Sequence, residues 1–242
     1  ISREEFWESL LSVALVNEGS EGNEGNNLLL DLHLFDANGD GLDDLVAGFG
    51  HGSTPSLLFL NENGTFVFEN GESLPTSIYG IDTNLHLETR SADLDNDGDL
   101  DLLIQHSRLE PYYGGNYLQV LRNDDGLFID MTESALAQSD DYIFGDRLNW
   151  SGDVFLRDLD NDGLLDILYG LHDGNLVAHF NKGSFSFDLL ATSLPDGQGG
   201  RLLAVDDLDN DNDQELLYYQ YGGTPSEKVY FLNVYEFNFL KP

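Results

Sequence analysis

The feature that most constrains the fold of this chain is an acidic nine-residue segment that occurs four times. The copies read DANGDGLDD (36–44), DLDNDGDLD (93–101), DLDNDGLLD (158–166) and DLDNDNDQE (207–215). Their first residues are 57, 65 and 49 positions apart. Self-similarity at such a period indicates an array of equivalent structural units.

Short apolar segments flank every copy. LLLDLHLF, LHLETRSA, DVFLR and RLLAV precede the copies, and LVAGFG, LLIQH, ILYGL and LLYYQ follow them. Their length and composition are typical of strands rather than helices. Later in each unit an apolar segment ends in an asparagine, namely Asn61, Asn123, Asn181 and Asn233, and in three units an aromatic-rich stretch follows. We therefore expect each unit to be a four-stranded antiparallel meander.

Sheets of this composition are apolar on both faces, so each one must stack on a neighbour. Radial stacking gives an all-β fold of the β-propeller type, and a linear solenoid is the alternative, although units of this length are long for one coil. The predicted organisation is an N-terminal segment (1–27) and a propeller domain (28–242). Its four repeats span about 28–84, 85–150, 151–198 and 199–242.

The acidic segments have the ligand chemistry of a calcium loop. Calcium binds roughly six to eight hard oxygens supplied by alternating side chains and a backbone carbonyl of a tight loop. Positions 1, 3, 5 and 9 supply side-chain oxygens, and position 7 would offer its carbonyl by analogy with other calcium loops. The sequence thus predicts up to four calcium ions. The predicted ligands are Asp36, Asn38, Asp40, Leu42 and Asp44; Asp93, Asp95, Asp97, Asp99 and Asp101; Asp158, Asp160, Asp162, Leu164 and Asp166; and Asp207, Asp209, Asp211, Asp213 and Glu215.

Position 6 of such a loop must turn sharply, and glycine adopts a positive φ there without steric cost. Gly41, Gly98 and Gly163 meet this need, and Asn212, the next most tolerant residue, predicts weaker binding in the fourth copy. An EF-hand is excluded, because it needs flanking helices and a glutamate at position 12. That position holds Ala47, Ile104, Tyr169 and Tyr218.

Magnesium and a metal-free acidic turn are the alternatives to calcium. Magnesium suits a loop this rich in ligands less well, because it retains its bound water. A solvated acidic turn would explain one copy, since Asp, Asn and Gly are ordinary turn residues. Four copies at the same point of a repeated unit favour a metal site.

The segments DLDNDGDLDLLI and LRNDDGLFIDMTESAL closely resemble the FG-GAP/VCBS repeat family, known from integrin alpha-subunit heads and secreted bacterial proteins. The resemblance covers about residue 28 to the C-terminus. It implies a β-propeller in which loops between the first and second strands of each blade bind calcium. Asn212, Glu215 and the presence of four repeats, where many relatives have seven, depart from the family pattern and leave ring closure open.

Charge limits the partners of the chain. Its 45 acidic and 10 basic residues give a formal net charge of −35, which disfavours nucleic acids and anionic membrane surfaces. No apolar run is long enough for membrane insertion, and without cysteine there are neither disulfides nor thiolate metal sites. Extracellular calcium modules bind at about 10⁻⁴ to 10⁻³ M, so we expect an extracellular or cell-surface location.

The N-terminal segment admits two interpretations. Ser2 and Glu5 fit a capping box ahead of a helical apolar stripe in residues 1–16. Alternatively, Glu8-Ser9-Leu10 matches the tail that ends other units, so this segment would be the last strand of a preceding blade. It could then close a four-bladed ring; otherwise the chain is a fragment of a larger ring. Residues 17–27 are expected to be a polar loop.

A histidine follows the second strand in three repeats, on the rim expected opposite the acidic loops. We interpret that rim as a face for an extracellular protein or glycan, although histidine also simply suits a polar turn. The predicted ligand-binding residues are His51, His106, Tyr112, Tyr113, Arg147, Trp150 and His172. A structural subunit of an extracellular assembly, with self-association, is the alternative. A polysaccharide-degrading enzyme that uses His106, Arg108 and Tyr112 is the less favoured alternative, since no catalytic motif is present.

Overall fold

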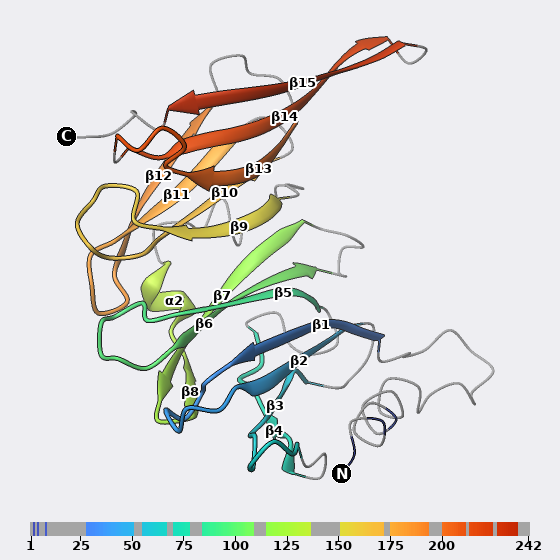
Figure 1. Ribbon diagram of the computed structural model, residues 1–242, viewed down its shortest axis with the longest axis vertical. Helices are drawn as coiled ribbons and strands as arrows, with labels where there is room; N and C mark the ends of the chain where they lie inside the picture. Colours follow the sequence, from blue (N-terminus) through green and yellow to red (C-terminus); the bar gives the residue numbers. More distant parts are fainter. Residues whose placement is uncertain are drawn as a thin grey trace. The chain divides into compact units, whose positions relative to one another are not determined.

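The computed structural model describes residues 2, 4, 8, 28–50, 55–66, 70–77, 84–108, 115–136, 151–171, 175–193, 200–211, 213–224 and 227–236. Within these ranges the chain is almost entirely antiparallel β-sheet, which confirms the predicted all-β class (Figure 1). It forms two compact units, Ile1–Asp93 with Asp97–Glu133, and Leu94–Asn96 with Ser134–Pro242. The helix or strand predicted for residues 1–16 and the loop of 17–27 lie, apart from residues 2, 4 and 8, outside the described residues.

The first unit holds two meanders in which consecutive strands pair antiparallel. The Gly50–Leu85 pair joins the second strand of the first meander to the first strand of the second. A short helix, α2 (Thr132–Ala135), follows the second meander. The strands are β1 (Leu28–Phe35), β2 (Asp44–Gly50), β3 (Leu57–Phe59) and β4 (Glu72–Ser73), then β5 (Asn84–Ala92), β6 (Asp101–Arg108), β7 (Asn116–Asp124) and β8 (Leu127–Asp130).

The second unit holds a four-stranded and a three-stranded sheet, both antiparallel. The predicted strand order is thus present in three repeats, whereas the fourth has three strands among the described residues. These strands are β9 (Ser151–Arg157), β10 (Asp166–Leu171), β11 (Asn175–Asn181) and β12 (Phe187–Ser193), then β13 (Gly200–Asp206), β14 (Glu215–Thr224) and β15 (Glu227–Glu236).

One predicted equivalence is wrong. Asn61, Asn123 and Asn181 directly follow or lie near the end of the third strand of their repeats, next to the acidic loop. Asn233 instead lies within β15, opposite Tyr218, because β14 and β15 form a longer hairpin that pairs Glu215 with Glu236. Asn233 therefore does not reach the acidic loop of its own repeat in the way the other three asparagines do.

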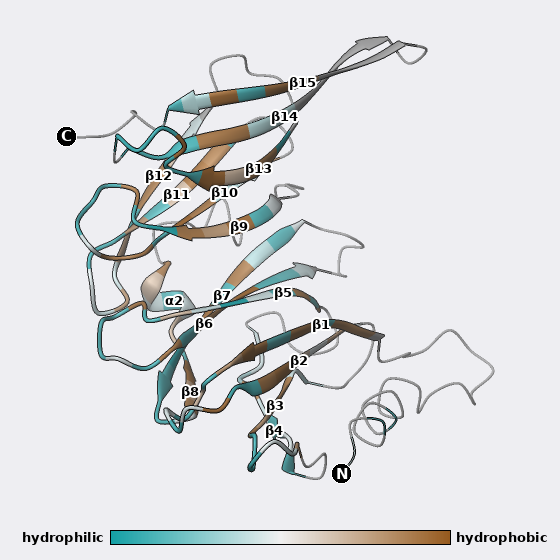
Figure 2. Ribbon diagram, in the orientation of Figure 1, coloured by the Kyte–Doolittle hydropathy of each residue, from teal (hydrophilic) through white to brown (hydrophobic). Residues whose placement is uncertain are grey.

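The second strand of each repeat lies inside a core. Every residue of β2 and of β10 is buried, as expected for strands whose sequences are nearly continuously apolar. In Figure 2 such apolar stretches are brown, whereas the acidic connections are teal. A strand buried on both faces must be covered from two sides, which requires neighbouring sheets to stack.

Stacking of neighbouring repeats is visible within each unit. In the first unit, Val46 and Leu58 of the first repeat share a core cluster with Ile104 and Leu121 of the second. In the second unit, Leu168 and Leu176 pack in one cluster with Leu202, Leu216 and Tyr218. Each meander thus buries its apolar face against the next meander of the same unit.

Candidate metal-binding loops

Each acidic segment connects the first two strands of its repeat, as predicted. We call them loop 1 (36–44, between β1 and β2), loop 2 (93–101, β5 and β6), loop 3 (158–166, β9 and β10) and loop 4 (207–215, β13 and β14). Position 9 of each loop is the first residue of the second strand. The loop is therefore anchored at its end by a buried strand, which fixes the position-9 side chain.

Carboxylates at positions 1 and 9 organise the loop backbone. In loop 3, Asp158 accepts hydrogen bonds from the backbone N–H groups of Asp162 at 3.1 Å and Gly163 at 2.9 Å. The carboxylate of Asp166 accepts the N–H of Leu159 at 2.8 Å. Loop 1 repeats this pattern with its own residues, Asp36, Asp40, Gly41, Asp44 and Ala37. The side chains at both positions are thus held in a defined geometry by the loop itself.

The loop turns twice through a positive φ. Position 6 does so as predicted, at Gly41 (86°), Gly98 (102°) and Gly163 (89°), while Asn212 lies outside the described residues. Position 4 also has a positive φ, which the sequence analysis missed, at Gly39 (70°), Asn96 (63°), Asn161 (59°) and Asn210 (64°). Only Gly and Asn occupy position 4, the residue types that tolerate this conformation, and that was the available signal.

Carboxylates from positions 1, 3 and 9 converge. In three loops they bring ligand oxygens within 4.8 Å of one another; the groups are Asp93, Asp95 and Asp101; Asp158, Asp160 and Asp166; and Asp207, Asp209 and Glu215. In loop 1 position 3 is Asn38, so an amide oxygen replaces one carboxylate. Glu215 keeps the role of aspartate in loop 4, because its Oε2 accepts the N–H of Leu208 at 2.6 Å.

The position-5 carboxylate also orders the loop backbone, and its predicted role as a ligand stays a prediction. Its side chain is absent from these convergent groups. Instead its Oδ1 accepts the backbone N–H of position 7, in the pairs Asp40–Leu42, Asp97–Asp99, Asp162–Leu164 and Asp211–Asp213. The ligand roles proposed for the carbonyls of Leu42, Asp99, Leu164 and Asp213 remain predictions.

Two carboxylate oxygens of the loops are buried without a hydrogen bond. Among the described residues, Asp93 Oδ1 in loop 2 and Asp160 Oδ1 in loop 3 have no hydrogen-bonding partner. Leaving a buried carboxylate oxygen unsatisfied is costly, and native structures contain few such atoms. Both atoms belong to the convergent groups, so a cation there would supply the missing interaction. The donor set, all hard oxygen, fits a divalent ion such as calcium.

The electrostatics of the loops agree with this fit. Burial raises the pKa of Asp166 to about 6, and the neighbouring charges of Asp160 and Asp162 act in the same direction. Burial likewise raises the pKa of Asp44 above its ordinary value. Without a counter-ion the carboxylates of Asp44 and Asp166 thus resist ionisation, and a bound cation would reverse that preference.

The ligand-face prediction required His106 to lie on an exposed rim, but the residue is buried. Its side chain is 3% exposed within β6, its Nε2 is 2.9 Å from Gln119 Oε1, and its ring stacks on Tyr117. Burial lowers the pKa of His106 to about 3, so the ring is neutral. β6 continues to Arg108, so His106 lies within a buried strand, with Gln105 and Ser107 also buried, rather than in the turn expected after it.

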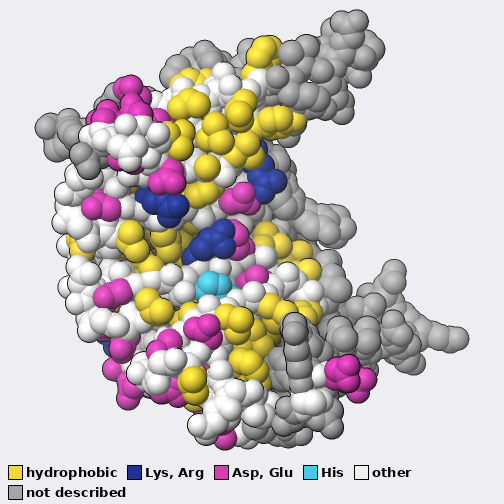
Figure 3. Space-filling model, in the orientation of Figure 1, with side chains coloured by type: hydrophobic (Ala, Val, Ile, Leu, Met, Phe, Trp, Pro, Cys, Tyr) yellow, Lys and Arg dark blue, Asp and Glu magenta, His cyan; other side chains and the backbone are white. Residues whose placement is uncertain are grey.

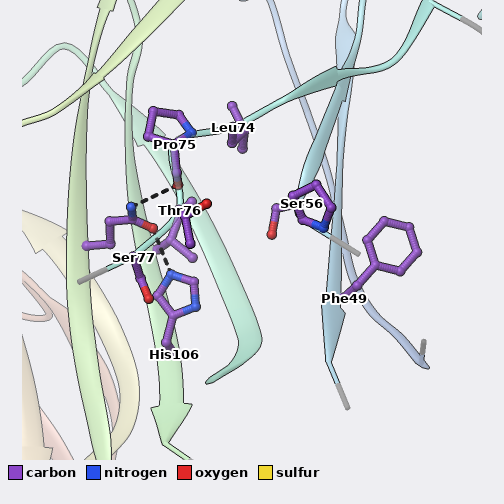
Figure 4. A pocket seen from close by; sticks show the side chains of 10 residues that line it. Phe49, Ser56, Leu74, Pro75, Thr76, Ser77 and His106 are labelled. Carbon is purple, nitrogen blue, oxygen red and sulfur yellow. Dashed lines mark hydrogen bonds between the residues drawn. The ribbon is translucent and has the colours of Figure 1, made fainter. Parts of the chain in front are cut away.

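His106 lines a small cavity together with Phe49, Ser56 and Ser77 (Figure 4). The cavity measures about 20 Å³, which accommodates a water molecule but no sugar. Beside it lies a polar cluster that the sequence did not predict: His86 Nδ1 is 2.7 Å from Ser56 Oγ, and Nε2 is 2.7 Å from Thr89 Oγ1 and 3.3 Å from Asp31 Oδ2. Ser56 and Thr89 thus satisfy both ring nitrogens of His86, whereas Asp31 Oδ2 makes no hydrogen bond among the described residues.

The other residues of the predicted ligand face lie outside the described residues and stay predictions; they are His51, Tyr112, Tyr113, Arg147, Trp150 and His172.

Figure 3 shows acidic side chains distributed over the visible face, with few Lys and Arg among them. Among the described residues, no helix is long and apolar enough to cross a membrane.

Antiparallel sheet units that each carry an acidic loop between their first two strands define a class of repeat protein with candidate cation sites. A family model described as FG-GAP-like repeat matches residues 36–104, 93–169 and 158–218 of the chain. Because these matches together cover more than half of its 242 residues, the chain belongs to the FG-GAP-like repeat family. No curated protein matches the chain.

Proposed function

We propose that this chain is a calcium-stabilised β-propeller module that binds a protein or glycan outside the cell. The observation that carries the metal assignment is the unpaired oxygen of Asp93 and of Asp160, each buried inside a convergent carboxylate group. Membership of the FG-GAP-like repeat family supports a propeller arrangement of the sheets.

Calcium suits these loops better than other common divalent ions. The side chains offer oxygen only, whereas zinc sites use nitrogen and sulfur ligands, and magnesium retains water that so dense a ligand set would displace. Calcium loops of extracellular modules bind at about 10⁻⁴ to 10⁻³ M, a range filled at the calcium concentration outside the cell. The net charge of −35 further disfavours nucleic acid as the partner.

The metal assignment is tested by thermal melting of the whole chain over a calcium titration from excess EDTA to about 10 mM. A site filled to a hundred times its dissociation constant adds ~2.7 kcal/mol to the free energy of unfolding. We expect the melting temperature to rise by several degrees or more with calcium and to respond far less to magnesium. An unchanged melting temperature in EDTA would refute calcium stabilisation.

A matched pair of variants makes this test specific. Asp93→Asn removes one charge from the loop 2 group, and Asp188→Asn removes one from an exposed position on β12. We expect Asp93→Asn to reduce the calcium-induced shift and Asp188→Asn to leave it unchanged. Equal responses of the two variants would mean that calcium acts on overall charge rather than in the loops.

The partner is the less constrained half of the proposal. Tyr112, Tyr113, Arg147 and Trp150 are candidates for stacking on a sugar ring or a side chain. Screening the calcium-loaded chain on glycan and extracellular-protein arrays, with a Tyr112→Ala/Tyr113→Ala double variant alongside, tests this role. If the wild-type chain bound nothing on either array, the proposed recognition role would be refuted.

One observation favours a second candidate function, that of a structural subunit. On β15, Phe231, Leu232 and Val234 are 49%, 63% and 57% exposed, and β15 pairs with β14 only among the described strands. An exposed apolar strand of this kind invites association with another chain. Size-exclusion chromatography with and without chelator separates the candidates, because a calcium-loaded monomer argues against the subunit.

A further inference from the structure

A buried asparagine near the end of the third strand connects two acidic loops. Asn123 belongs to the second repeat, and its backbone N–H donates to Asp101 Oδ1 of loop 2 at 2.9 Å. Its side-chain Nδ2 donates to the Leu100 carbonyl of the same loop at 3.0 Å and to the Ala37 carbonyl of loop 1 at 2.7 Å. Its Oδ1 accepts the N–H of Gly126 at 2.8 Å. Asn123 is 1% exposed, so these bonds are shielded from water.

The connection continues into loop 1. Ala37, which accepts from Asn123, is itself 2% exposed and donates its backbone N–H to Asp44 Oδ2 at 2.9 Å. Three hydrogen bonds thus run from the position-9 carboxylate of loop 1 through Ala37 and Asn123 to the position-9 carboxylate of loop 2. Both ends of this chain of bonds are predicted calcium ligands.

The same arrangement occurs again in the next repeat. Asn181 is fully buried, donates its N–H to Asp166 Oδ1 at 2.8 Å, and donates Nδ2 to the Leu165 carbonyl at 3.1 Å. Its Nδ2 also donates to the Leu94 carbonyl, at position 2 of the preceding acidic loop, at 2.8 Å. An inter-loop bond that recurs at equivalent positions is a property of the repeat.

Resting on the calcium binding proposed above, we propose that Asn123 couples loops 1 and 2, so that calcium in one loop raises the calcium affinity of the other. An ion in loop 1 fixes the Asp44 carboxylate, which orders Ala37 and the acceptor that Asn123 uses. Asn123 then holds Asp101 in its binding position. A ligand group that is already ordered loses less conformational entropy when the second ion binds.

The sign of the effect separates this coupling from simple electrostatics. Two divalent cations bound near each other repel, so a through-space interaction would lower the affinity of the second loop and weaken with added salt. Coupling through buried hydrogen bonds raises the affinity and depends little on salt. Reciprocity requires the factor to be equal in both directions.

Asn61, the equivalent asparagine of the first repeat, provides a control. Asn61 of the first repeat donates its N–H to Asp44 at 2.7 Å and its Nδ2 to the Asp43 carbonyl at 2.9 Å, and it accepts from Gly64 at 2.7 Å. These bonds lie within its own repeat, and no bond from its side chain to another loop is found among the described residues. Asn61→Ala therefore removes local side-chain bonds alone, whereas Asn123→Ala removes local and inter-loop side-chain bonds together. Both variants keep the backbone N–H that donates to the position-9 carboxylate.

The experiment follows each loop separately by amide NMR of the whole chain during a calcium titration. The N–H groups of Gly41 and Gly98 donate to the position-1 carboxylates of loops 1 and 2 and report their occupancy. Asp36→Asn disables loop 1. We expect it to weaken calcium binding at Gly98 by about fivefold or more, the lower range of measured couplings. In the Asn123→Ala background the same change should shift that affinity less than twofold, and in the Asn61→Ala background it should keep its full effect.

If Asn123→Ala fails to fold, Asp93→Asn provides the second measurement, because reciprocity requires it to weaken binding at Gly41 by the same factor. Glycine signals that ignore calcium would refute the proposed function. Signals that shift with independent affinities, or with mutual weakening of the loops, would leave calcium binding intact and overturn the coupling.

Discussion

The ammonium group of Lys182 lies 3.3 Å from Oδ2 of Asp160, a carboxylate of the loop 3 group. Lys182 directly follows Asn181, and the corresponding residues of the first two repeats are Glu62 and Asp124. Loop 3 alone among these three therefore carries a tethered cation beside a predicted calcium ligand. The three loops differ in charge although their acidic segments are nearly the same.

Replacing Lys182 by Gln is expected to tighten calcium binding in loop 3. The variant removes a cation that competes for Asp160, and an exposed pair of this kind is worth ~0.7 kcal/mol, or about threefold in affinity. The Gly163 amide signal over a calcium titration measures the change. Arg201→Gln is the matched control, because it removes the same charge from the Arg201–Asp153 pair, and it should leave loop 3 unaffected. Weaker binding in Lys182→Gln would contradict the prediction.

Replacing Asn38 by Asp should give loop 1 the carboxylate that position 3 has in the other loops. A higher ligand charge strengthens calcium binding, while in the absence of calcium it adds repulsion next to Asp36 and Asp44. We expect the melting temperature of the variant to be lower than that of wild type in EDTA and higher in saturating calcium. A shift of the same sign under both conditions would speak against a metal role for position 3.

Acid should destabilise the fold partly through His179. This side chain is 1% exposed and packs beside Tyr169, and burial lowers its pKa to about 4 from an ordinary value of 6.5. As pH falls from 6.5 to 4 the unfolded chain takes up a proton that the folded chain does not, so stability is present above 6.5 and is lost over this window. His179→Phe should lose less free energy of unfolding between pH 7 and pH 4, by ~3 kcal/mol.

Urea denaturation of wild type and His179→Phe at fixed calcium and matched pH measures this difference. Comparing the two proteins at each pH cancels the acid sensitivity of the loops, which both share. Parallel loss of stability in the two proteins would show that His179 is already protonated, or exposed, in the folded state.

Glycine at position 48 is required for the packing of β2 against His86. A Cβ atom added there would overlap the buried imidazole, which is held by Ser56 and Thr89. Gly48→Ala should therefore lower the free energy of unfolding by about 1–3 kcal/mol. Gly152→Ala is the comparison, since its nearest neighbour is the flexible side chain of Arg201 at 3.3 Å, and thermal melts of the two variants should differ clearly. Similar melts would mean that His86 readily moves aside.

The loops were predictable from sequence because their backbone requires particular residue types at fixed spacing. Asp at positions 1, 3 and 9 and Gly at position 6 each meet a local need, so Asp93, Asp101 and Gly98 occupy the places expected of them. The hydrogen bond from the position-7 N–H to the position-5 carboxylate was not predicted, because Asp97 has the same side chain as its acidic neighbours in the loop.

Non-local features were harder to predict. The position of Asn233 depends on the register of β14 and β15, which a sequence without a fixed turn leaves undetermined. The burial of His106 depends on partners, Gln119 and Tyr117, that come from the next strand. The hydrogen bond from Asn123 to Ala37 joins residues 86 positions apart, and neither residue type indicates it in the sequence.

Because of that link, a single meander cannot be exchanged or removed as an independent unit. Each inter-loop asparagine belongs to the later meander but donates to the acidic loop of the earlier one, so a boundary placed between meanders would leave a buried carbonyl such as that of Ala37 without its donor. Chimeras and truncations should instead exchange segments that hold two consecutive acidic loops and the asparagine after the second, such as 36–123, because such a segment keeps the donor and the acceptor together.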